Sequence, residues 1–196
     1  MSQKMITDLI RGFIKNGRYD YVDPNIIKEI GLVDSAKLIG FLVEVYFVFY
    51  IETYFKDNLA DVEKVFAERK VGQSYPDIIL TYKGKQFRLE FKTYLDESTA
   101  KSSQFPTSAK KGSILRNELQ SEKYKDTDFV VFFLIKYNNG IFTPYDAIIL
   151  SIAKIKDLFN IKIKNKLLGD YRSIKFGTLE KLKLLNKISG LEEIDE

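Results

Sequence analysis

Polar and apolar residues alternate through residues 74–93, "SYPDIILTYKGKQFRLEFKT", on both sides of Lys83-Gly84. A period of two is typical of strands that bury one face, and Gly84 supplies the backbone freedom that a two-residue loop needs. The stretch therefore predicts a β-hairpin in which Ile78 pairs with Leu89. This register places the apolar side chains on one face, whereas a slip of one residue would exchange the two faces.

The rest of the chain predicts both helices and strands. Residues 2–16 have an amphipathic helical pattern, and Asp23-Pro24 is a typical start for a short second helix. The later elements are strands near 61–71, 76–82 and 86–94, a helix at about 113–124, a strand over 128–137, and helices over 146–159 and near 178–188. This order predicts an α/β sandwich whose mixed sheet begins as an antiparallel meander.

The most apolar run extends from Ser35 to Phe55. It is too long for a strand and predicts a buried helix, with Ser35 as its N-cap. Glu44 and Glu52 interrupt the run. They argue against a membrane span, because a charge at the centre of a spanning helix costs about 2.5–3.5 kcal/mol.

The composition limits both the fold and the chemistry. The 196 residues, 45% hydrophobic and 30% charged, suit a single globular domain with a core at about 36–160 and a basic extension at about 161–196. The chain has no Cys and no His, which excludes disulfides, thiolate metal sites and Ser-His-Asp catalysis. A metal would need oxygen ligands, which favours Mg²⁺, Mn²⁺ or Ca²⁺.

Positive charge is concentrated towards the C-terminus. Residues 152–187 contain ten Lys and Arg against three acids, a net charge of +7, whereas the whole chain carries +4. Such a block suits a polyanionic partner, although lysines on solvated helices give the same pattern. The N-terminus shows no signal peptide, so we expect a cytoplasmic protein without membrane attachment.

The predicted hairpin gathers three charged side chains at one end. Asp77 would face Glu90 across the strands, and Lys92 shares that face because it lies two residues further along. Carboxylates that face each other repel unless solvent screens them, one is protonated, or a cation lies between them. The pattern is therefore consistent with a hard-cation site and also with a charged, solvent-facing surface.

Pro76-Asp77, twelve intervening residues and Glu90-Phe91-Lys92 resemble the signature of the PD-(D/E)XK nuclease superfamily. The predicted order of elements is similar to the restriction endonuclease-like α-β-β-β-α-β core of that family, a mixed sheet flanked by helices. The resemblance implies hydrolysis of phosphodiester bonds with Mg²⁺, or with Mn²⁺ as a substitute. It implies that Asp77, Glu90 and the Phe91 carbonyl bind the ion and that Lys92 orients or deprotonates the attacking water.

A further acid is expected on the preceding helix. Glu44 resembles the helix glutamate that many members of this family use as an additional metal ligand, and Glu52 is its rival. An acid in so apolar a helix is costly unless it is paired or bound to metal, so an ion pair with a lysine is the alternative.

Candidate DNA contacts lie outside the hairpin. The stretch from Gln120 to Tyr124 resembles the Q-x-x-x-Y motif of the RecB-type branch of the family, although a polar helix face explains it equally well. Further basic residues are candidates for the DNA backbone or, for the last two, for bases: Lys101, Lys110, Lys111, Arg172 and Lys175. The first three fall in the polar stretch 97–113, which an ordinary surface loop would also explain.

The resemblance favours a Mg²⁺-dependent DNA endonuclease, most simply a type II restriction enzyme acting as a homodimer. One alternative is a structure-directed nuclease, such as a Holliday junction resolvase or a repair or viral nuclease. Another is a catalytically silent DNA-binding module that keeps the fold. A third is an unrelated α/β binding protein with a fortuitous motif.

Overall fold

The computed structural model describes residues 2–22, 32–55, 65–69, 76–82, 85–95, 113–115, 124–158, 162–163, 166–167 and 173–175. The helical elements in these ranges are α1 (Ser2–Asn16), α3 (Leu32–Tyr50), the π-helical turn η1 (Ile51–Phe55) and α7 (Ile152–Leu158). The strands are β1 (Val65–Arg69), β2 (Ile78–Tyr82), β3 (Lys85–Leu95), β4 (Ser113–Leu115), β5 (Phe129–Asn138), β6 (Ile141–Ser151), β7 (Lys162–Ile163), β8 (Lys166–Leu167) and β9 (Ser173–Lys175).

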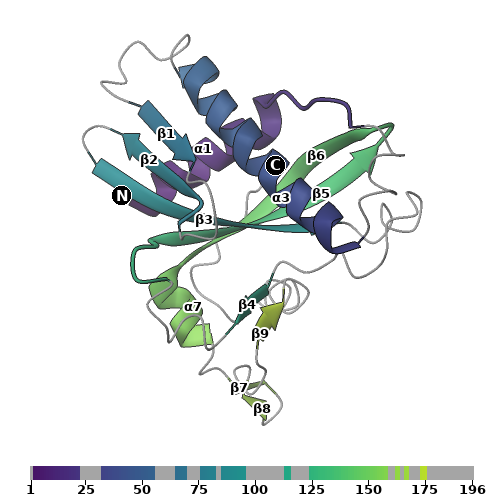
Figure 1. The fold of residues 1–196 in the computed structure, drawn as a ribbon. Helices are drawn as coiled ribbons and strands as arrows, with labels where there is room; N and C mark the ends of the chain where they lie inside the picture. Colours follow the sequence, from purple (N-terminus) through teal and green to yellow (C-terminus); the bar gives the residue numbers. More distant parts are fainter. Residues whose placement is uncertain are drawn as a thin grey trace.

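Five strands form the central sheet, in the order β1-β2-β3-β5-β6 (Figure 1). The first three strands are an antiparallel meander, β5 lies parallel to β3, and β6 returns antiparallel to β5. The expected α/β class and the mixed sheet that begins as a meander are therefore confirmed. The predicted hairpin register is confirmed as well, since Ile78 pairs with Leu89 and Tyr82 pairs with Lys85.

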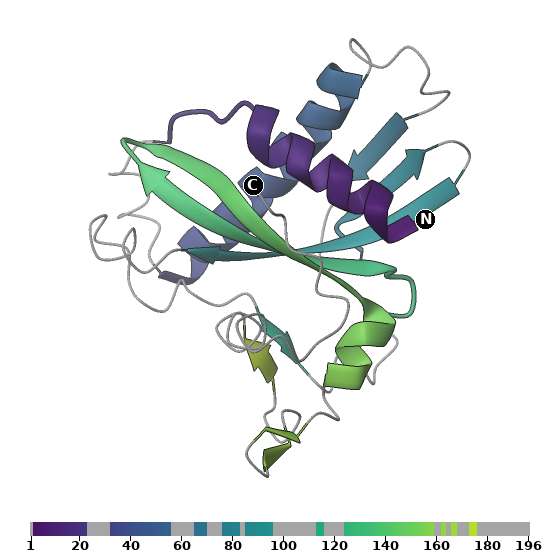
Figure 2. The ribbon, with the colours of Figure 1, turned by 180° about the vertical axis from the view of Figure 1, so that it is seen from behind.

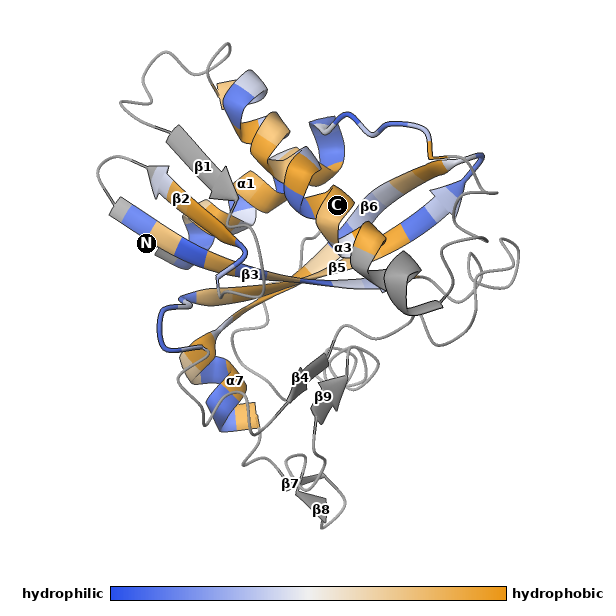
Figure 3. Cartoon of the chain, in the orientation of Figure 1, coloured by the Kyte–Doolittle hydropathy of each residue, from blue (hydrophilic) through white to orange (hydrophobic). Residues whose placement is uncertain are grey.

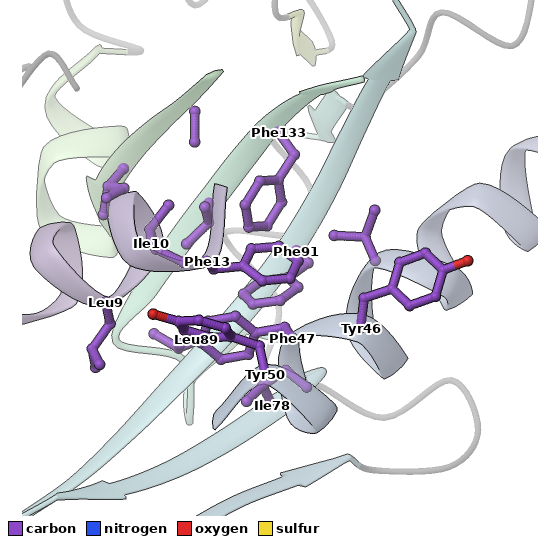
Figure 4. Packing of buried hydrophobic residues seen from close by; sticks show 14 of the residues in the cluster. Leu9, Ile10, Phe13, Tyr46, Phe47, Tyr50, Ile78, Leu89, Phe91 and Phe133 are labelled. Atoms are coloured by element: carbon purple, nitrogen blue, oxygen red, sulfur yellow. The ribbon is translucent and has the colours of Figure 1, made fainter. Parts of the chain in front are cut away.

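Helices α1 and α3 cover one face of this sheet, and α7 lies beyond the other face (Figures 1 and 2). Side chains alternate along a strand, so the odd-numbered residues of β3 and β5 point towards α1 and α3. Phe91 and Phe133 meet Phe13 of α1 and Phe47 of α3 there, with ring centroids 5.0–5.7 Å apart in edge-on or near edge-on pairs (Figure 4). This aromatic cluster fills the core between the helices and the sheet.

The long apolar helix is confirmed, with a small correction at its start. Helix α3 already includes Leu32, so Ser35 lies inside it and the prediction of Ser35 as the N-cap is wrong. The stretch Leu38–Phe55 is long and apolar enough to span a membrane by length and composition. Its inner side packs in the core, and its apolar residues run around much of the helix (Figure 3).

The C-terminal half of the sheet differs from the prediction. A helix was expected over 146–159, but residues 141–151 form the edge strand β6, and α7 begins only at Ile152. The strand follows a tight turn in which Asn139 and Gly140 have φ angles of 49° and 86°. Two successive left-handed residues are what a two-residue hairpin requires, and Asn-Gly is its commonest sequence. The hairpin with β5 therefore overrides the local helical pattern.

Long-range pairing corrects the start of the helix expected at about 113–124, whereas residues 116–123 lie outside the described residues. Its first three residues form strand β4, which pairs antiparallel with β9. The partner strands lie far apart in sequence, so no local pattern in this region could reveal the pairing. The helices expected at Asp23-Pro24 and near 178–188 lie outside the described residues.

Candidate active site

The candidate site lies where β2 and β3 meet, on the sheet face opposite α1 and α3. Ile78 and Leu89 point into the main core, so Asp77, Glu90 and Lys92 fall on the other face. Parallel pairing places Glu90 beside Val130 and Lys92 beside Phe132 on β5, both of which are buried. Glu90 and Lys92 are thus set beside buried apolar residues and do not lie on an exposed, solvent-facing strand.

Asp77 is fixed by the backbone of the neighbouring strand. It stands at a bend immediately before β2, and its Oδ2 accepts a 2.7 Å hydrogen bond from the Phe91 N–H. The Phe91 side chain is meanwhile anchored on the opposite face by Phe47 and Phe133. The Asp77 carboxylate is therefore held next to Glu90 by a contact that links the end of one strand to the middle of the other.

Glu90 is a buried acid, with only 2% of its surface exposed. Its Oε1 accepts a short hydrogen bond from Lys92 Nζ, while Oε2 is buried and no donor among the described residues reaches it. Burial raises the pKa of Glu90 to about 8; the charge and hydrogen bond of Lys92 oppose this rise, whereas Asp77 adds to it. A protonated Glu90 can donate to Asp77, and an ionised Glu90 leaves an oxygen without a partner.

Lys92 completes the cluster. Its side chain is 19% exposed and forms an ion pair with Glu90, two residues away on the same strand. Lys92 lies beside the buried Phe132 of β5 in the parallel register, and its ammonium group is held at the Glu90 carboxylate. The structure thus brings together all three charged residues that the sequence pattern singled out.

The oxygen atoms at this site suit a hard cation. Two carboxylates and the Phe91 carbonyl are the kind of ligands that Mg²⁺ and Mn²⁺ take, and the buried Glu90 Oε2 is an acceptor in need of a positive partner. Within the ranges that the structure describes, no three acidic side chains cluster closely enough to form a metal site by themselves. A cation here would therefore need backbone, water or substrate oxygens in addition to the two carboxylates.

The expected third acid is placed differently. Glu44 is half-buried on α3, which covers the sheet face opposite Glu90, and Glu52 is exposed on η1. Neither joins Asp77 and Glu90 in a three-acid cluster among the described side chains. Metal binding by Glu44 thus stays a prediction.

The candidate DNA contacts fall mostly outside the described residues. This applies to Lys101, Lys110, Lys111, Gln120 and Arg172. Lys175 lies on β9, where its backbone pairs with Ser113 of β4. These two strands lie on the same side of the sheet as α7 (Figure 1). The alternation of side chains along β3 places Glu90 on that side, opposite α1 and α3.

Sequence reasoning missed a second charged cluster beside the site. Arg88 pairs with Asp128 through its guanidinium at 3.1 Å and with Asp126 at 3.3 Å. The backbone N–H of Arg88 also donates to Asp128 Oδ2, and the Asp128 N–H donates to the Arg88 carbonyl. An acidic pair directly before a buried strand was the available signal, but only the parallel register of β3 and β5 shows that it meets Arg88.

Comparisons with known proteins give no identification. No model of a known protein family matches the chain, and none of the curated proteins matches its sequence. Any function therefore has to be inferred from the fold and from the geometry of this site.

Proposed function

We propose that this chain is a Mg²⁺-dependent DNA endonuclease that hydrolyses phosphodiester bonds. The observation that carries the proposal is the contact of the buried Glu90 carboxyl with the half-buried Asp77, with Lys92 paired to Glu90. Burying an acid next to a second carboxyl lowers the stability of the fold, so stability does not explain why the two are together. Acids with a strongly shifted pKa concentrate at functional sites. The resemblance of these residues to the PD-(D/E)XK signature supports the same function.

Each residue has a distinct part in the proposed reaction. Asp77 and ionised Glu90, with the Phe91 carbonyl, would hold Mg²⁺, and Mn²⁺ would substitute for it. When bound, the ion supplies Lewis-acid activation of the phosphate and of a water molecule. Lys92 Nζ, kept beside Glu90 by their ion pair, would orient the attacking water and offset the negative charge that develops on the phosphate.

The reaction consumes one water molecule. Its oxygen forms a bond to phosphorus while the bond from phosphorus to the 3′ oxygen breaks, leaving a 5′-phosphate and a 3′-hydroxyl. The basic C-terminal part of the chain would contact the DNA backbone, and binding would then weaken with added salt. A homodimer would allow both strands to be cut, since one site cuts one strand.

The test is cleavage of long duplex DNA with Mg²⁺, with EDTA, and by the variants Asp77→Ala, Glu90→Gln and Lys92→Met. Asp8→Asn is a matched control, because it removes one exposed carboxylate on α1, far from the site in sequence. Discrete fragments that need Mg²⁺ and vanish in the three variants would support a type II restriction enzyme. A smear, or cutting of four-way junctions alone, would favour a structure-directed or non-specific nuclease.

Intact duplexes, junctions and single strands under all conditions would overturn the proposed catalysis. Binding of DNA without cleavage would then favour a silent binding module. A lack of both DNA binding and any stabilisation by Mg²⁺ or Mn²⁺ would favour an unrelated binding protein.

A further inference from the structure

Arg88 is a close neighbour of Glu90 on strand β3. It lies two residues before Glu90 on β3, so the two side chains project from the same face of the strand as nearest neighbours along it. Arginine binds a carboxylate strongly because its guanidinium can form two parallel hydrogen bonds to the two oxygens. An arginine at this position would be a natural competitor for any cation at the Asp77–Glu90 pair.

The guanidinium is instead directed to the start of β5. Arg88 Nε and one terminal nitrogen donate to the two oxygens of Asp128 at 3.3 and 3.1 Å, which is a bidentate pair. The other terminal nitrogen donates to Asp126 at 3.3 Å. All three guanidinium nitrogens are therefore engaged by two aspartates, and Glu90 is paired with Lys92.

We propose that Asp128, assisted by Asp126, is a positioning residue that holds Arg88 away from Asp77 and Glu90 and so leaves these carboxylates to a divalent cation. This inference rests on the proposed function, because it assigns the aspartates a role only if a cation binds at the Asp77–Glu90 pair. Asp128 Oδ2 accepts from both the Arg88 backbone N–H and Nε, whereas Oδ1 accepts only from a terminal guanidinium nitrogen and the Asp128 N–H donates to the Arg88 carbonyl. The inference concerns the charge that these oxygens present to the guanidinium.

The two roles of Asp128 can be separated by substitution. Asp128→Asn keeps an oxygen that can accept from the Arg88 N–H, but it removes the charge that binds the guanidinium. If Asp128 were merely structural, also replacing Arg88 by Gln would not restore the cation affinity that Asp128→Asn had lost. If Asp128 restrains Arg88, Arg88→Gln in the same chain should restore cation binding, because the competing positive charge is gone.

The experiment measures Mn²⁺ affinity by titration calorimetry, and Mn²⁺-dependent thermal stabilisation, in the wild type and four variants. These are D128N, R88Q, the double variant R88Q/D128N, and D8N as a control for loss of one exposed carboxylate. We expect D128N to bind Mn²⁺ about tenfold more weakly, the effect of one added charge a few ångströms away in a partly screened site. R88Q/D128N should recover most of the wild-type affinity, and D8N should retain it.

Loss in D128N with recovery in the double variant supports the inference. Wild-type affinity in D128N, or a loss that R88Q does not reverse, would overturn it while leaving the cation site of the proposed function intact. If the wild type gives no Mn²⁺ response, so that it cannot be told from Asp77→Ala, the proposed function is overturned and this inference with it. If D128N proves poorly folded, Asp126→Asn tests the same inference, and the expected loss of Mn²⁺ affinity is smaller because the Asp126 side chain is 67% exposed.

Discussion

Replacing Glu90 by Gln should change how the stability of the protein depends on pH. The folded protein raises the pKa of Glu90 from 4.5 to about 8, chiefly because the carboxyl is buried. The folded chain therefore binds this proton more tightly than the unfolded chain does. The free energy of unfolding must then fall as the pH rises from about 4.5 to about 8, and the loss is complete above that range.

The size of the effect follows from the same shift. A rise in pKa from 4.5 to about 8 corresponds to about 5 kcal/mol of lost stability once Glu90 is ionised in the fold. Gln has nearly the same shape and no charge to bury. We expect E90Q and the wild type to have similar stability near pH 4, and E90Q to be several kcal/mol more stable at pH 9.

The measurement is urea unfolding, followed by circular dichroism, at a series of pH values in EDTA. The chain is well suited to it, because it has no His and no Cys to titrate in the same window. D8N should follow the wild-type curve. Parallel curves for E90Q and the wild type between pH 5 and 8 would show that Glu90 is not held protonated, and the account of the buried pair would then be wrong.

Three glycines give further predictions, each measured by urea or thermal unfolding. Gly12→Ala should cost about 1–3 kcal/mol, because its Cβ would overlap the Tyr50 hydroxyl, and Tyr50→Phe in the same chain should reverse most of this loss. Gly140→Ala should cost at least about 1 kcal/mol, because its φ of 86° is strained for any residue with a side chain. Gly40→Ala in α3 should stabilise by about 0.5–1 kcal/mol, since its Cβ would meet only Thr93 Oγ1 at 3.9 Å. A loss in Gly40→Ala, or no rescue by Tyr50→Phe, would contradict the packing described for these helices.

The sequence predicted local features well and distant pairings poorly. The β2–β3 hairpin was predictable in register because strict alternation and a short loop fix it, and the Asp77, Glu90 and Lys92 cluster follows from that register. Strand β6 was missed although Asn139-Gly140 marks the turn that precedes it. The residues after that turn were assigned to a helix, and only their pairing with β5 makes them a strand.

The second charged cluster illustrates the other limit. Arg88 and Asp128 are forty positions apart, and their contact depends on the register of a parallel pair joined by a long crossover. Sequence periodicity indicates that β5 is buried, but it does not determine which residue of β3 lies beside which residue of β5. Neither the restraint on Arg88 nor the depth at which Glu90 is buried could be obtained from the pattern alone.

The outer edge of the sheet has a consequence for self-association. Strand β6 carries Pro144, which has no N–H to donate, and the ladder with β5 is irregular between Leu134 and Ile135. At one end of the strand, Tyr21 bridges to Ile141. Such features hinder the pairing of an edge strand with a strand of another molecule, and that pairing is how sheet edges lead to aggregation. Copies of this chain should therefore resist sheet-to-sheet polymerisation along β6, and the expected homodimer would have to form through a different surface.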